Sequence, residues 1–127
     1  MCALALVACT LVACGSKAVD PFDIMVRLGE KDYGIYFMIN EDDIEEMANE
    51  IDVSSRGVEY LIYVEPDKYY DERAGVFIFC EDKQSADKLE ATLEDNADEK
   101  NHITRDIVVR KGLMIFYGCE DAWEDAQ

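Results

Sequence analysis

The chain has 127 residues, half of them hydrophobic, which is enough for one domain with a modest core. It carries 29 acidic residues against 12 basic ones, so its formal net charge is -17 at pH 7. That charge opposes contact with polyanions, so we expect no nucleic-acid partner, and we expect most of the carboxylates to form a hydrated surface.

The chain begins with an apolar run in which no charged residue precedes Lys17. The run is shorter than the roughly 20 residues that cross a bilayer as a helix, but it suits the apolar region of a signal peptide, about 7 to 15 residues. It ends in Leu11-Val12-Ala13-Cys14, with Gly15-Ser16 behind it. An aliphatic residue thus lies three positions before a cysteine, with small residues on either side of the cysteine.

This segment resembles the lipobox of bacterial lipoproteins. The resemblance implies cleavage between Ala13 and Cys14 and a diacylglycerol on the Cys14 thiol, whose two acyl chains are fatty acids such as palmitate. Two acyl chains give durable anchoring where one gives only marginal binding. Leu6-Val7-Ala8-Cys9 is a similar box, but cleavage there would leave apolar residues 11–13 on the mature chain in water.

The resemblance also implies how the chain is divided and where in the cell the protein is located. Residues 1–13 are then a signal peptide that is removed, residues 14–19 a lipidated tether, and residues 20–127 a single folded domain. The mature protein is expected at the cell membrane, held on its extracytoplasmic face by lipid.

The folded part opens with a predicted helix. Asp20 is placed to cap it, Pro21 suits the first helical position, and Gly29 ends it. Residues 33–39 then alternate, with apolar side chains in both sets, which predicts a strand in the centre of its sheet.

Asn40 is a candidate cap for the next helix, whose apolar residues recur at helical spacing. These residues are Ile44, Met47, Ala48 and Ile51. Residues 54–57 form a loop, and residues 58–65 a second strand that ends at Pro66.

A third strand is predicted over residues 76–80, and Asp82 then caps a helix that buries Ala86, Leu89 and Leu93. The polar residues 95–102 are predicted to form a surface loop. Residues 107–109 and 113–117 flank a Gly-containing turn and form a hairpin, and residues 120–126 form a last short helix.

This order of elements predicts an α+β fold with a ferredoxin-like βαββαβ core. Its two helices would cover one face of a mainly antiparallel sheet, with an extra N-terminal helix, a C-terminal hairpin and a short C-terminal helix. Such a fold does not by itself imply an activity.

The cysteines left in the mature chain are Cys80 and Cys119, because Cys2 and Cys9 leave with the signal peptide and Cys14 carries the lipid. The two thiols either pair as a disulfide or stay unpaired as small buried side chains, and we favour the unpaired state. No CxxC motif indicates a thiol redox enzyme.

No catalytic constellation is apparent in the sequence. His102 is the only histidine, and no phosphate-binding loop, HExxH motif or calcium loop is present, so we expect no catalytic residues and no cofactor. Carboxylates cluster at several places, and Asp95, Asp98 and Glu99 are the least weak candidates for a divalent cation.

Tyrosines are the remaining candidates for a contact site. Several of them are expected to line the sheet face that the helices leave uncovered, where they would either meet a ligand or simply fill a strand surface. This candidate contact face consists of Tyr36, Tyr60, Tyr63, Tyr69 and Tyr70.

The sequence therefore favours a non-enzymatic binding or accessory module, anchored through Cys14, with a protein of the cell envelope as its partner. The first alternative is a divalent-cation-binding envelope protein. The second is an envelope enzyme that uses a pair of carboxylates.

Overall fold

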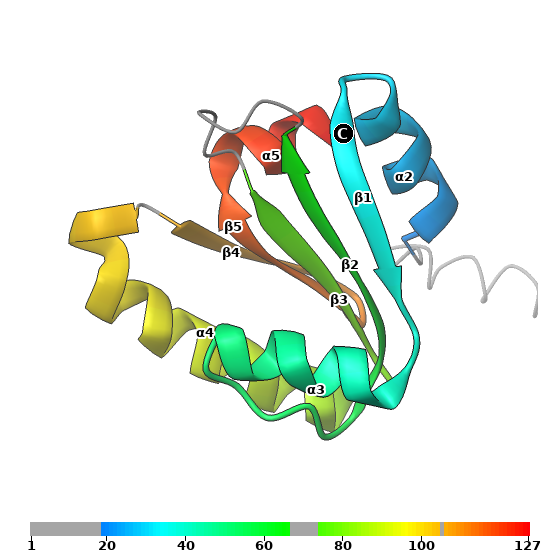
Figure 1. The fold of residues 1–127 in the computed structure, drawn as a ribbon. Helices are drawn as coiled ribbons and strands as arrows, with labels where there is room; N and C mark the ends of the chain where they lie inside the picture. Colours follow the sequence, from blue (N-terminus) through cyan, green and yellow to red (C-terminus); the bar gives the residue numbers. More distant parts are fainter. Residues whose placement is uncertain (1–18, 67–73, 105) are drawn as a thin grey trace, which may run out of the picture.

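The computed structural model describes residues 19–66, 74–104 and 106–127 (Figure 1). For residues 98–104 it describes the backbone but not the side chains. The lipobox with Cys14, and both Tyr69 and Tyr70, lie outside the described residues. The elements are α2 (Pro21–Gly29), β1 (Tyr33–Met38), α3 (Glu41–Glu50), β2 (Val58–Pro66), β3 (Gly75–Cys80), α4 (Lys83–Thr104), β4 (Asp106–Lys111), β5 (Met114–Cys119) and α5 (Glu120–Asp125).

The five strands form one antiparallel sheet in the order β1-β2-β3-β5-β4, so the α+β class is confirmed. The strand order differs from that of a ferredoxin-like core, which consists of two split βαβ units. Helix α4 does join two parallel strands, β3 and β4, with β5 between them. Helix α3 instead joins β1 and β2, which are antiparallel neighbours. No strand lies between these two, unlike in a split βαβ unit.

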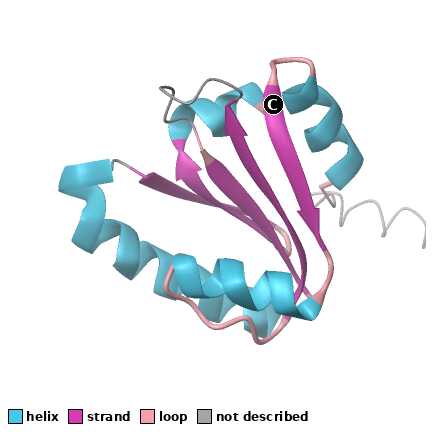
Figure 2. Cartoon of the chain, in the orientation of Figure 1, coloured by secondary structure: helices cyan, strands magenta, loops and turns pink. Residues whose placement is uncertain are grey.

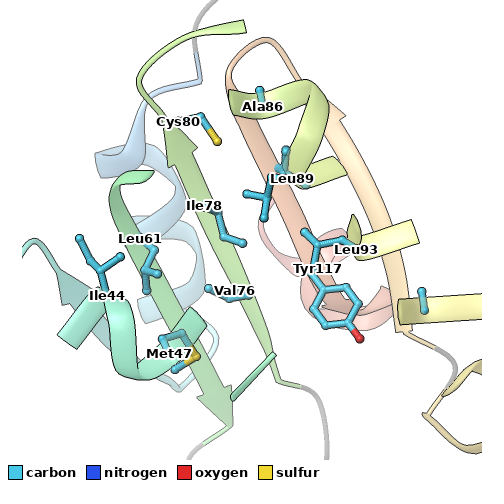
Figure 3. Close-up of a cluster of buried hydrophobic side chains, with 12 residues drawn as sticks. Ile44, Met47, Leu61, Val76, Ile78, Cys80, Ala86, Leu89, Leu93 and Tyr117 are labelled. Carbon is cyan, nitrogen blue, oxygen red and sulfur yellow. The ribbon is translucent and has the colours of Figure 1, made fainter. Parts of the chain in front are cut away.

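Helices cover both faces of the sheet, as Figure 2 shows. Side chains of α3 and α4 pack on one face around Leu61, Ile78 and Ile115, and Figure 3 shows this cluster. Side chains of α2 and α5 pack on the other face around Phe77 and Phe116. The sheet is therefore the middle of three layers, and the prediction of a face without helices is wrong.

Strand β1 lies at an edge of the sheet and not in its centre. Its two apolar faces have another cause, because each contacts a helical layer. Ile35 packs against the cluster around Phe77 and Phe116, named here the α2 cluster, and Met38 packs against the cluster around Leu61 and Ile78, named here the α3 cluster. Alternation with apolar side chains on both faces thus indicates two covered faces, which an edge strand also has in a three-layer fold.

The predicted helix starts are confirmed. The Asp20 side chain accepts a hydrogen bond from the backbone N–H of Phe22 (2.9 Å), and Asn40 does the same for Asp42 (2.9 Å). The Asp82 side chain accepts from the N–H of Ser85 (2.8 Å). Each cap satisfies a backbone donor that lacks a partner in the first turn of its helix.

Helix α4 continues to Thr104, so the predicted loop over residues 95–102 is wrong. The period of buried residues runs on, since Ala97 follows the buried Leu93 at a spacing of four. Asn96 fixes the same turn, because its side-chain amide donates to the carbonyl oxygens of Ile51 and Asp52, both at 3.1 Å. Among the described helices, none has both the length and the apolar composition that a membrane span requires.

Candidate binding site

The structure separates the tyrosines of the predicted contact face. Tyr36 and Tyr63 are opposite each other on β1 and β2, on the face that carries α3, and their ring centroids are 6.0 Å apart. Tyr60 lies on the α2 face, where it stacks on Phe79 at 4.6 Å and neighbours Phe37 at 5.4 Å. The first two tyrosines share one site, and the third belongs to a different surface.

Tyr36 and Tyr63 line a pocket of about 370 Å³ between the β1–β2 edge of the sheet and α3, named here the tyrosine pocket. Two methionines, Met38 and Met47, supply apolar lining, and Met47 reaches into the buried cluster drawn in Figure 3. The remaining lining residues are the carboxylates Asp43, Glu46, Glu50 and Glu65.

The sequence pattern explains why these side chains converge. Tyr36 and Met38 are two residues apart on β1 and therefore point to the same face. Asp43, Met47 and Glu50 are spaced by four and three residues on α3, so they lie along one side of that helix, with Glu46 beside them. Because β1 and β2 are neighbours, Tyr63 joins Tyr36 from the adjacent strand.

Glu65 holds both phenols. The Tyr36 hydroxyl donates to its Oε1 and the Tyr63 hydroxyl donates to its Oε2, each at 3.2 Å. Burial raises the pKa of Tyr63 above its usual value, and the negative charge and hydrogen bond of Glu65 raise it further. The phenol of Tyr63 therefore stays neutral at physiological pH, and one carboxylate orients both rings.

The tyrosine pocket has a single sign of charge. Among the described residues that line it, four are acidic and none is basic. Asp43, Glu46 and Glu50 are exposed and form no ion pair with any other described residue. Two aromatic rings next to unpaired carboxylates are suited to a cationic group, which the ring faces and the negative charges both attract.

A larger cavity, of about 660 Å³, lies between α2 and the β4–β5 hairpin. Its basic groups already serve the fold: Arg27 donates to the carbonyl oxygen of Ala126 (3.3 Å), and Lys111 donates to the side chain of Gln127 (3.2 Å). The Lys111 ammonium also lies 5.1 Å from the centre of the Trp123 ring. This cavity therefore offers less uncommitted charge to a ligand than the tyrosine pocket does.

Of the predicted metal candidates, only the side chain of Asp95 lies among the described residues. Asp95 lies on the exposed side of α4, and the side chains of Asp98 and Glu99 lie outside the described residues. Within the part of the chain that the structure describes, no three potential ligands are close enough to share a metal ion.

Cys80 and Cys119 are unpaired. They lie at opposite ends of β3 and β5, since the Cys80 N–H bonds to Leu113 and the Cys119 N–H bonds to Ala74. Cys80 packs in the α3 cluster and Cys119 against the α2 cluster, so the two thiols also point to opposite faces. Burial raises the pKa of the Cys80 thiol to about 11, which keeps it protonated and unreactive.

The sequence pointed to Tyr36 and Tyr63 but not to the other residues of the tyrosine pocket. The missing information was the pairing of β1 with β2, which brings Glu65 beside both tyrosines. The spacing of Asp43, Glu46 and Glu50 on one side of α3 was visible, but such a row is equally typical of a helix surface exposed to water.

Comparisons of the chain with protein-family models, with curated proteins and with solved structures find no significant match.

Proposed function

We propose that this protein is a non-enzymatic binding module, anchored by lipid on Cys14 at the extracytoplasmic face of the membrane, whose contact site is the tyrosine pocket. The observation that carries the second part is the composition of that pocket: two oriented rings, four carboxylates and no basic residue among its described lining. The partner group is therefore cationic.

The energetic basis is additive attraction at a partly enclosed surface. A cation over a tyrosine ring gains about 0.5–1 kcal/mol when exposed and about 2 kcal/mol when desolvated. The carboxylates of α3 add to this attraction, and the methionines bury the alkyl part of the cation. Such a site would bind an ammonium or guanidinium group and would not catalyse a reaction of it.

The lipobox supports the proposed anchor. Val19, the first described residue, follows Cys14 by five residues, a distance of at most about 18 Å when fully extended. A lipid on Cys14 would thus keep the domain next to the bilayer surface.

The anchor is tested by detergent-phase partitioning of the full chain expressed in a bacterium that processes lipoproteins. We expect the wild-type protein in the detergent phase and Cys14→Ala in the aqueous phase, because the substitution removes the thiol that takes the lipid. The variant Cys9→Ala is the control, and it should partition as the wild type does. Equal partitioning of wild type and Cys14→Ala would show that the anchor is not on this residue.

The pocket is tested by titrating the protein with tetramethylammonium and with arginine amide, followed by NMR. We expect shifts of the Tyr36 and Tyr63 ring signals that saturate in the wild type. Glu46→Gln should weaken binding several-fold, whereas Glu45→Gln, which removes the same charge from the same helix outside the pocket, should leave it unchanged. Equal effects of the two variants would mean that the cation responds to overall charge and not to this site.

The divalent-cation alternative makes a distinct prediction for the same titration. Calcium would have to produce the same ring shifts and compete with tetramethylammonium. The enzymatic alternative is favoured by no observation on the described residues.

A further inference from the structure

The outer edge of β1 differs in character from the opposite edge of the sheet, which β4 forms. Its six residues, Tyr33–Met38, include no charged residue and no proline, although the chain as a whole carries a charge of -17. Among the strands that the structure describes, β1 pairs only with β2. Proteins usually protect such an edge with charges, proline or a bulge, because its backbone groups accept a further strand.

The opposite edge of the sheet is protected in the usual way. Strand β4 contains Asp106, Arg110 and Lys111. Arg110 is held against α4 by ion pairs with Asp87 and Glu90, so a helix and its charges lie beside this strand. The contrast between the two edges indicates that the lack of protection is specific to β1.

Exposed apolar side chains gather at the same edge. Tyr36 is 48% exposed, Phe37 is 47% exposed, and Ile39 just beyond the strand is 67% exposed. Alternation along β1 places Tyr36 in the tyrosine pocket and Phe37 on the opposite face. A strand laid along this edge would therefore contact an acidic aromatic pocket on one face and an apolar side chain on the other.

We propose that β1 accepts an extended, basic segment of a partner protein as an additional strand, with a lysine or arginine side chain of that segment in the tyrosine pocket. This inference rests on the proposed function of the pocket and names the partner. An added strand runs about 4.8 Å from β1, and its alternate side chains face the same side as Tyr36 and Met38. The matching segment alternates basic residues, which face the carboxylates of α3, with apolar residues, which face Phe37.

Charge selects this occupant over a second copy of the chain. Antiparallel pairing of β1 with β1 of another copy would put both α3 helices on one face of the joined sheet. Their exposed carboxylates, including Asp43, Glu46 and Glu50, would then lie close to one another without a basic partner in the pocket. Like charges placed together oppose such pairing, whereas a basic segment neutralises them.

The test uses a synthetic peptide of about eight residues, the length of an ordinary strand, in which lysine and valine alternate. Two control peptides are a variant with the same composition but with the lysines in one block, and a variant with methylated backbone nitrogens. Binding is measured by calorimetry at about 0.15 M salt, where long-range attraction between exposed charges is screened. Hydrogen exchange of the β1 amides is followed in parallel.

We expect the alternating peptide to bind and to slow hydrogen exchange in β1, and we expect both control peptides to bind at least about tenfold more weakly, a loss of ~1.4 kcal/mol. Phe37→Lys adds a like charge to the edge and should weaken the peptide several-fold while tetramethylammonium still binds the pocket. Phe22→Lys is the control, because Phe22 is also an exposed aromatic residue (69%) but lies on α2, and this variant should change neither.

Equal binding of the methylated peptide, or of the block peptide, would overturn strand addition while leaving the pocket as a cation site. Binding of the alternating peptide that Glu46→Gln does not weaken would overturn the place of the lysine in the pocket. Failure of both the peptide and tetramethylammonium to bind would overturn the proposed function together with this inference.

Discussion

Glu65 determines much of the electrostatics of the tyrosine pocket, because its two oxygens accept hydrogen bonds from two phenols. A carboxylate in this position disfavours a second negative charge on the Tyr63 ring. Tyr63 is also partly buried, and burial is the larger cause of its raised pKa. Burial and the charge of Glu65 thus each raise the pKa of Tyr63, and a substitution of Glu65 removes the second effect without the first.

Glu65→Gln should lower the pKa of Tyr63 towards its ordinary value of 10.0 without reaching it, because the charge is lost and the burial remains. The measurement is an NMR titration of ring-labelled tyrosine. Glu59→Gln is the matched control: Glu59 raises the pKa of Tyr60, so this variant should shift Tyr60 and leave Tyr63 in place. No change at Tyr63 in Glu65→Gln would mean that burial alone sets its pKa.

The same shift gives a pH dependence of stability. The folded protein holds the Tyr63 proton more tightly than the unfolded chain does, so stability is unaffected below the ordinary pKa of 10.0 and falls as the pH rises above it. Glu65→Gln should make this fall less steep, because the folded and unfolded pKa values move closer together.

At the scale of the elements, β3 and β5 approach each other closely where Gly75 is paired with Gly118. A Cβ on Gly118 would lie 2.5 Å from the Gly75 Cα and 2.6 Å from the Ala74 carbonyl oxygen, both backbone atoms with little freedom to move. Gly118 also has a φ of 149°, which L side chains rarely adopt. The contact fixes the end of the sheet from which α5 begins.

Gly118→Ala should therefore lower the free energy of unfolding by at least about 1–3 kcal/mol, the usual cost of overpacking, with a further penalty from the backbone angle. Gly112→Ala is the comparison, because Gly112 also has a positive φ (62°) but no atom lies within 4 Å of the added Cβ. It should cost only about 1 kcal/mol. Urea unfolding of both variants provides the measurement, and equal losses would show that the angle and not the contact dominates.

The extent to which the elements could be predicted depends on how local their causes are. Asp20, Asn40 and Asp82 cap helices through contacts within three residues, and these starts were predicted correctly. The continuation of α4 past residue 95 was missed, and there Asn96 bonds to residues 51 and 52, which are distant in sequence. The direct pairing of β1 with β2 was missed for the same reason. A strand–helix–strand pattern in the sequence looks the same whether the second strand lies beside the first or is separated from it by another strand.

The candidate site follows the same rule at a larger scale. Alternation along β1 and helical spacing on α3 were both visible, so the faces of Tyr36 and Glu46 could be derived separately. Their meeting in one pocket requires the sheet order, which pattern alone does not contain. That helices cover the second face of the sheet could likewise be known only from the positions of α2 and α5. Tyr60 lies on that second face, apart from Tyr36 and Tyr63.

On the scale of the whole described domain, Val19 and the tyrosine pocket lie on opposite faces of the sheet. Val19 packs with the α2 cluster, and it lines cavities that share no residue with the tyrosine pocket. The proposed anchor on Cys14 would therefore join the described domain on the face opposite the proposed contact site.

The net charge of the whole chain should make stability and binding respond to salt in opposite directions. With 29 acidic and 12 basic residues, most carboxylates have no cation to pair with, so self-repulsion opposes the compact state. Raising the salt from about 0.01 M to about 0.15 M shortens the screening length from about 30 Å to about 8 Å, and the melting temperature should rise. Over the same range the affinity of the tyrosine pocket for an alternating lysine peptide should fall, because screening weakens attraction as well as repulsion.

Sucrose, which stabilises by exclusion from the protein surface without screening charges, is the control and should raise the melting temperature with little loss of peptide affinity. A melting temperature that falls with added sodium chloride would mean that ion pairs such as those of Arg110 with Asp87 and Glu90 outweigh the repulsion among the unpaired carboxylates.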